Sequence, residues 1–93
     1  MKYTWDENKN RRNIEQHGIA FSDAVRIFEG ATLETEDSRF EYGEIRIYAI
    51  GLMNGLEISV IYTDRNDDER RIISARRAEP HERRTYWKSR SQY

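Results

Sequence analysis

The amino-acid sequence predicts an α+β domain in which two N-terminal helices pack on a small, mainly antiparallel β-sheet, with a further helix at the C-terminal end. Three observations carry this prediction. Helix signals run up to Gly30, residues of high β-propensity alternate from Ala31 onward, and a helix start follows at Glu79-Pro80. Ninety-three residues suffice for one modest core, so a single domain over residues 1–93 is expected.

The first helix is expected over Asp6–His17, after a short β-like start at Lys2–Trp5. Asp6 offers a carboxylate at the N-cap, and Gly18 is placed to end the helix in the left-handed conformation with a contact between Ile14 and Ile19. Ile14 is the only aliphatic residue of this helix. We therefore interpret its polar surface as a solvated face.

The second helix is expected to begin at Ser22, whose hydroxyl suits an N-cap, and to end at Gly30. Ala24, Val25 and Phe28 fall on one face of it and predict burial in the core.

The strand region contains a hairpin signature. Strands are expected over Thr32–Glu36, Glu44–Met53 and Leu56–Thr63, with a polar connection at Asp37–Gly43. Asn54-Gly55 between β-rich runs is typical of a type I′ turn, which sets the register so that the numbers of paired residues sum to 109. This register places Ala49 and Val60 on the helix side, and Arg46 with Thr63 on the other face.

The last strand, RRIISARR from Arg70, follows a turn at Asp64–Asp68 whose length does not settle its register. If Ile73 and Ala75 face the helices, Arg71 and Arg77 belong to the helix side or the edge. The other face would then carry Arg46, Thr63, Arg70, Ile72, Ser74 and Arg76. Arg46 and Arg76 are expected to converge there.

The last helix is predicted to start at Pro80, because the first helical position needs no backbone N–H bond. It carries Arg83, Arg84 and Tyr86. Tyr86 is expected to close the arginine surface from this helix.

Charge is divided unevenly along the chain. Residues 30–69 carry three basic and ten acidic side chains, whereas residues 70–93 carry eight basic and two acidic ones. This pattern favours a local anion site, although the two blocks could also neutralise each other across neighbouring strands. Cysteine is absent, no apolar run approaches the length of a membrane span, and the start of the chain does not resemble a signal peptide, so a cytoplasmic protein is expected.

No dense enzyme motif is present, and the two histidines lie at different helix ends, so neither a metal site nor a cofactor is expected. The arginine, tyrosine and hydroxyl set fits metal-independent RNA cleavage, in which fixed arginines stabilise a dianionic transition state. The proton carrier stays open among Tyr86, His17 and Glu44.

The chain also resembles a known family through the segments YTWDENKNRRNIEQHGIAF, YGEIRIYAIG, VIYTDR and RIISARRAEPHERRTY. These are similar, in the same order, to BrnT-type toxins of the BrnT/BrnA type II toxin-antitoxin systems. The resemblance implies a RelE-like fold and a ribonuclease that suppresses translation and is held inactive by a BrnA-like antitoxin in a hetero-oligomer. Ile45 departs from the family, which often has a second acid there, and Pro80 and His81 replace more usual polar and basic residues. The polar positions that match are Trp5, Asp6, Lys9, His17, Glu44, Arg46, Thr63, Arg65, Ser74, Arg76, Arg83 and Tyr86.

The leading hypothesis is therefore a metal-independent ribonuclease toxin. Its expected catalytic residues are Arg46, Arg76, Tyr86, His17 and Glu44, and its expected RNA-binding residues are Lys9, Thr63, Arg65, Ser74 and Arg83. The alternative is a catalytically silent module that binds an acidic antitoxin-like partner through the same arginines. DNA binding is a weaker hypothesis, because the basic residues do not form a recognition helix preceded by a turn.

Overall fold

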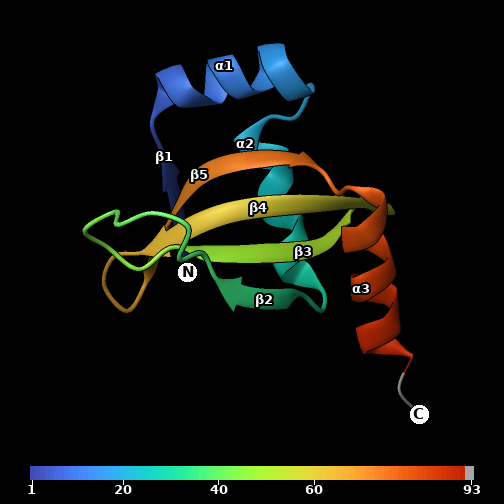
Figure 1. Ribbon diagram of the computed structural model, residues 1–93. Helices are drawn as coiled ribbons and strands as arrows, with labels where there is room; N and C mark the ends of the chain where they lie inside the picture. Colours follow the sequence, from blue (N-terminus) through green and yellow to red (C-terminus); the bar gives the residue numbers. More distant parts are fainter. Residues whose placement is uncertain (92–93) are drawn as a thin grey trace.

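The computed structural model describes residues 1–91 and has a five-stranded sheet in the order β1-β5-β4-β3-β2 together with three α-helices (Figure 1). Its mixed α+β class agrees with the prediction. Within residues 1–91, no helix is both long and apolar enough to cross a membrane. The elements in chain order are β1 (Lys2–Trp5), α1 (Glu7–His17), α2 (Phe21–Ala24), the 3-10 helix η1 (Val25–Glu29), β2 (Leu33–Glu36), β3 (Ile47–Met53), β4 (Leu56–Asp64), β5 (Glu69–Arg77) and α3 (Pro80–Arg90).

Neighbouring strands of the sheet are antiparallel except β1 and β5, which run parallel. The hairpin register is confirmed from Ile47 opposite Tyr62 to Met53 opposite Leu56. Its turn residue Asn54 has φ 52° and the following glycine has φ 81°, as a type I′ turn requires. Strand β3 begins at Ile47, three residues later than the sequence suggested.

The main core lies between one face of the sheet and the segment formed by α2 and η1. Ala49 and Val60 are fully buried there, as the hairpin register predicted. A Cβ atom on Gly51 would lie 2.8 Å from Cβ of Ile27, so the glycine allows η1 to approach β3 closely. Helix α3 packs on the opposite face, where Tyr86 meets Ile50.

The second helical segment begins differently from the prediction. Its N-cap is Ala20 rather than Ser22, and the helix continues as 3-10 after one turn. The N–H of Phe21 is satisfied by Oδ1 of Asn10 at 2.8 Å, a residue of α1. A side chain from the preceding helix thus replaces the local cap, which the local sequence pattern did not reveal.

Helix α1 lies along the β5 side of the sheet (Figure 1). The buried amide of Asn13 holds it there. Strand β1 pairs with β5 only as far as Ile72, so Ala75 lies beyond its reach. Asn13 Nδ2 donates to the carbonyl of Ala75 at 2.8 Å, and its Oδ1 accepts from the N–H of Ala75 at 3.2 Å. Asn13 also donates to the carbonyl of Ile19 at 2.9 Å. The side chain therefore replaces a strand at this edge. Lys9, Arg11 and Arg12 of the same helix are exposed, as the prediction of a solvated polar face requires, and Asn13 is its buried exception.

The structure confirms the predicted ends of α1 and the predicted start of α3. Asp6 caps α1 by accepting from the N–H of Lys9 at 3.1 Å, and Gly18 has φ 71° at the other end. Pro80 is the first residue of α3, with Glu79 as the N-cap.

Replacing Asn13 with alanine should lower the free energy of unfolding by about 2–4 kcal/mol, because it leaves both backbone groups of Ala75 unpaired in a buried place. Urea unfolding followed by fluorescence measures this. Asn8→Ala on the exposed side of the same helix is the matched control and should change stability by less than about 0.5 kcal/mol. Equal effects of the two substitutions would contradict the role of Asn13.

Candidate active site

A β-bulge in β5 decides which arginines face which side of the sheet. Ile61 pairs with Ser74, but the next residue of β4, Tyr62, pairs with Ile72, so Ile73 has no partner. An unpaired residue reverses the side-chain alternation of the strand beyond it. The assumption that Ile73 and Ala75 share the helix side is therefore wrong, and Ile72 is the residue buried in the helix-side core.

The bulge sends Arg70 to the helix side, where it has a structural role. Its guanidinium binds both carboxylate oxygens of Asp64, at 2.8 and 3.1 Å. Its Cζ lies 4.0 Å from the ring centre of Tyr62 and 4.7 Å from that of Phe28. Burial, and then a hydrogen bond to Glu34, raise the pKa of Tyr62 well above its ordinary value, so this tyrosine stays neutral.

The same bulge turns Arg71 toward Thr63, on the face that carries Arg46. A pocket of about 140 Å³ lies at this end of the sheet, and we call it the basic pocket. Four of its side chains are cationic and two are carboxylates. It is lined by Asp6, Lys9, Glu44, Arg46, Thr63, Arg65, Arg71, Ile72 and Ile73.

The parallel pairing of β1 with β5 brings the start of α1 to the basic pocket. Trp5 pairs with Ile72, so Asp6 and Lys9 follow directly beside the bulge. The pKa of the Asp6 carboxyl is lowered mainly by the N–H of Lys9, with a smaller contribution from the charge of Arg71. Asp6 is thus a helix cap at the wall of the pocket.

Arg46 is held from two sides. Its Nε lies 3.1 Å from Oε2 of Glu44, and its Cζ stacks 3.9 Å from the ring centre of Tyr42. The hydroxyl of Thr63 donates to the carbonyl of Ile45 at 2.7 Å, which fastens the chain just before Arg46. Thr63, expected to bind RNA, therefore holds the backbone next to Arg46.

The loop before β3 is held by Asp37. Its carboxylate accepts two hydrogen bonds from Arg39, at 2.8 and 3.0 Å, and one from the hydroxyl of Tyr42 at 3.2 Å. Its N–H donates to the carbonyl of Arg46 at 2.8 Å. The bond with Arg39 is the main cause that lowers the pKa of Asp37. The loop thereby fixes the ring on which Arg46 stacks.

Three cations of the basic pocket have no ion pair within 4 Å to any residue of the part of the chain that the structure describes. They are Lys9, Arg65 and Arg71, whereas Arg46 is paired with Glu44. Cations gathered without neutralising partners attract anions, and guanidinium groups match phosphate oxygens bidentately. The pocket is therefore suited to a phosphate group beside one carboxylate, that of Glu44.

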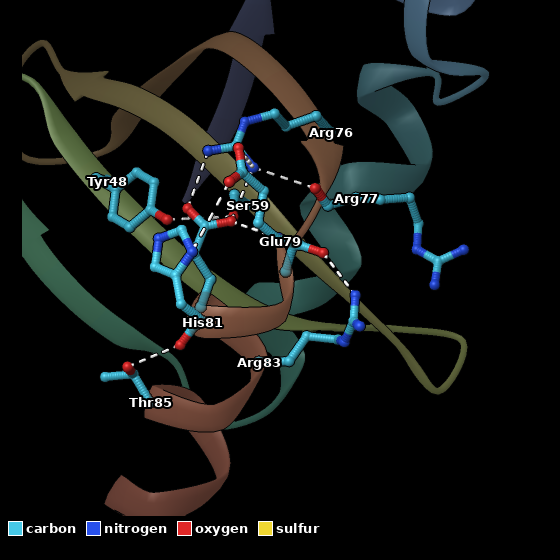
Figure 2. A network of polar contacts seen from close by, with 10 residues as sticks. Tyr48, Ser59, Arg76, Arg77, Glu79, His81, Arg83 and Thr85 are labelled. Atoms are coloured by element: carbon cyan, nitrogen blue, oxygen red, sulfur yellow. Dashed lines mark hydrogen bonds and ion pairs between the residues drawn. The ribbon is translucent and has the colours of Figure 1, made fainter.

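Arg76 lies elsewhere, and the expected convergence with Arg46 is wrong. It pairs with Ser59, four residues along β4 from Thr63, or roughly 13 Å at the usual rise of a strand. Its guanidinium binds both oxygens of Glu82, at 2.8 and 2.9 Å, and Glu82 also accepts from Ser59. The same carboxylate accepts from the N–H of Glu79 at the start of α3. Figure 2 shows Arg76 and Ser59 in this network of polar contacts.

The remaining predicted residues also lie outside the basic pocket. Tyr86 is only 2% exposed, and its hydroxyl donates to the carbonyl of Ala31 at 3.1 Å. It therefore belongs to the apolar cluster between α3 and the sheet. His17 is exposed at the end of α1 opposite to Lys9. Arg83 donates to the carbonyl of Ala78 at 2.9 Å, and Ser74 lies opposite Ile61 in mid-sheet.

Five of the ten predicted site residues thus share no pocket with the other five. The basic pocket contains Lys9, Glu44, Arg46, Thr63 and Arg65, and it adds Arg71, which sequence reasoning had assigned to the other side. Within residues 1–91, no group of three or more His, Asp or Glu side chains is arranged to hold a metal ion.

The comparisons with known proteins agree with this architecture. The family model described as "Ribonuclease toxin, BrnT, of type II toxin-antitoxin system" matches residues 5–82. The chain belongs to the BrnT family of ribonuclease toxins. The 1.1 Å crystal structure of the Brucella abortus ribonuclease toxin BrnT is similar to it with a TM-score of 0.66 and 32% sequence identity, covering 85% of this chain and 97% of that one. A search of curated proteins found no match.

The resemblance to BrnT toxins noted in the sequence is thereby confirmed. The stretch matched by the BrnT family model contains every residue that lines the basic pocket, whereas Tyr86 and Arg83 lie beyond its end.

Asp37→Asn should weaken the fold at neutral pH by about 1 kcal/mol, because a charge-assisted pair with a largely exposed arginine is lost. The pKa of Asp37 lies below its ordinary value of 3.8, so its contribution is complete above that pH and disappears as the pH falls through the lower folded value. Urea unfolding should show a larger difference from wild type at pH 7 than at pH 2. An equal difference at the two pH values would contradict this account. Asp67→Asn, in the exposed β4–β5 turn, is the matched control and should resemble wild type at both.

Proposed function

We propose that this BrnT-family chain is a metal-independent endoribonuclease that cuts RNA at the basic pocket, inhibits translation in the cytoplasm and is neutralised by a cognate BrnA-like antitoxin in a hetero-oligomer. The observation that carries the proposal is the gathering of Lys9, Arg65 and Arg71, unpaired among the described residues, around the Arg46–Glu44 pair. A RelE-like relationship of the fold belongs to the same proposal. It is supported by two helical segments that precede a mainly antiparallel sheet.

The reaction needs a cluster of cations because charge increases as it proceeds. The 2′-hydroxyl of a ribose attacks the adjacent phosphate, and the transition state carries two negative charges on its oxygens. Donors fixed before the reaction stabilise that charge without reorganisation. Arg46 is fixed by Glu44 and Tyr42, and Arg71 by its place in β5, so these two arginines hold the phosphate.

Proton transfer is assigned to groups of the same pocket. Glu44 takes the proton of the 2′-hydroxyl, since Asp6, the other carboxylate, is engaged as the cap of α1. Lys9, an ammonium with three N–H donors, gives a proton to the departing 5′-oxygen. Ile45, where the family often has a second acid, is exposed beside Glu44. In this chain Glu44 is therefore the single carboxylate that accepts the proton of the 2′-hydroxyl.

Arg71→Ala should reduce kcat/KM for cleavage of single-stranded RNA in EDTA by about 100-fold, because one fixed donor to the transition state is lost. Arg84→Ala, on the exposed surface of α3, is the matched control and should retain wild-type activity. If Arg71→Ala cleaves like wild type while Arg76→Ala does not, the site lies at the Glu82 network instead. If EDTA abolishes cleavage, the reaction requires a metal.

Glu44→Gln should lower kcat for RNA cleavage at pH 7 by about 100-fold, because the amide cannot accept a proton. The matched control is Glu15→Gln, an exposed position of α1, which should cleave like wild type. Wild-type kcat in Glu44→Gln would assign the base to another group.

Expression of this chain alone should arrest bacterial growth, and co-expression of the adjacent antitoxin gene should restore it. Arg71→Ala should not arrest growth, since the proposal attributes the arrest to cleavage. A chain that binds the antitoxin tightly but neither cleaves RNA nor arrests growth is instead the catalytically silent module.

A further inference from the structure

We propose that the loop between β2 and β3 forms a binding subsite for the nucleobase next to the cleaved phosphate, and that it prefers guanine. This inference rests on the proposed function and names the substrate feature that the site would select. The loop extends beyond the sheet at the end where the β4–β5 turn and β1 also lie (green in Figure 1).

A second pocket adjoins the basic pocket and shares Glu44 with it. Its volume is about 460 Å³, larger than that of the basic pocket. It is lined by Glu36, Asp37, Ser38, Phe40, Glu41, Tyr42, Gly43 and Glu44. One side of Glu44 therefore faces the cations, and the other borders a space of different chemistry, with one exposed aromatic ring and several carboxylates.

Phe40 supplies a stacking surface close to the phosphate site. The residue is 68% exposed, and its ring centre lies 5.8 Å from that of Tyr42. The Tyr42 ring centre in turn lies 3.9 Å from Cζ of Arg46. Tyr42 thus connects the exposed ring to the arginine of the basic pocket. Bases of single-stranded RNA commonly stack on such rings.

The loop is organised before any ligand arrives. Asp37 binds Arg39 and the Tyr42 hydroxyl, and Gly43 provides the left-handed turn, with φ 73°, that brings the chain back toward β3. These contacts hold the residues on both sides of Phe40, so binding a base costs less conformational entropy. Phe40 itself is exposed and contacts the Tyr42 ring, so its other face is available for a ligand.

The carboxylates of the second pocket select the base. Glu36 and Glu41 are exposed and have no ion pair within residues 1–91. A carboxylate accepts two parallel hydrogen bonds and so matches the adjacent N1–H and N2–H donors of guanine. Adenine and cytosine present a single exocyclic amino donor there, and uracil presents a single N3–H between two carbonyl oxygens that repel a carboxylate. The expected order is guanine first and uracil last.

A nucleobase fits this loop better than a protein partner does. The neighbours of Phe40 are the polar residues Arg39 and Glu41, and the other large apolar side chain exposed within residues 37–46 is Ile45. Two separate side chains are a small apolar surface, whereas a stable protein interface buries about 800 Å² on each side. Phe40 lines the second pocket, which shares Glu44 with the basic pocket, and the cations of the basic pocket suit a polyanion.

The test measures affinity for uncleavable RNA by fluorescence anisotropy. The probes are 2′-O-methyl uridine hexamers, either unsubstituted or with one guanine, adenine or cytosine. Wild type should bind the guanine hexamer about tenfold more tightly than the uridine one. Phe40→Ala should weaken guanine binding about tenfold, Phe40→Trp should retain it, and Glu41→Gln should reduce the preference for guanine. Leu56→Ala, an exposed apolar residue at the β3–β4 hairpin, is the matched control and should bind like wild type.

A hexamer carrying 2-aminopurine gives a second readout that distinguishes stacking from a general loss of structure. Its fluorescence should be quenched on binding to wild type and Phe40→Trp, and not on binding to Phe40→Ala. Equal affinity of wild type for all hexamers would overturn the subsite, and so would unchanged binding and quenching in Phe40→Ala. In either case, RNA cleavage by wild type would still support the proposed function. Absence of RNA binding by wild type overturns both. Loss of antitoxin binding alone in Phe40→Ala would assign the loop to a protein partner.

Discussion

The unpaired residue Ile73 in β5 is the feature on which the arrangement of charges depends. Without this bulge, the alternation of the strand would turn Arg70 toward Arg46 and bury Arg71 on the helix side. With it, Arg70 stacks on Tyr62 and Phe28 inside the fold, whereas Arg71 faces Thr63 at the basic pocket. One extra residue thus converts adjacent arginines into a structural group and a candidate catalytic group.

The basic pocket is assembled from segments that are distant in sequence, and polar contacts hold them together. The parallel pairing of β1 with β5 brings the start of α1 to the bulge, and Asn13 fastens the middle of that helix to the sheet edge. The Asp37 loop holds Tyr42 under Arg46 from the other side. A small protein with a modest core can therefore fix its site precisely enough for chemistry through amide and carboxylate contacts.

The elements of this fold could be predicted from sequence wherever the signal is local. Asn54-Gly55 determines the hairpin register, Asp6 and Gly18 mark the ends of α1, and Pro80 begins α3. The bulge has no comparable local signal, because RRIISARR alternates equally well in either register. The missed role of Arg71 follows from that. Arg76 does lie on the predicted face, but it pairs with Ser59, four residues from Thr63, because the turn before β5 does not fix the register of that strand. Tyr86 lies in the core rather than at the basic pocket, because a tyrosine beside arginines suits a core helix as well as a site. The aromatic residue that Arg46 does contact is Tyr42, four positions before it in the sequence.

The central claim is that the phosphate to be cleaved binds between Arg46 and Arg71. A crystal structure of the chain with a 2′-O-methyl RNA hexamer tests it most directly. The account predicts one phosphate within hydrogen-bonding distance of both guanidinium groups, with Glu44 beside the adjacent ribose. A phosphate bound at Arg76 after displacement of Glu82, with the basic pocket left vacant, would contradict it.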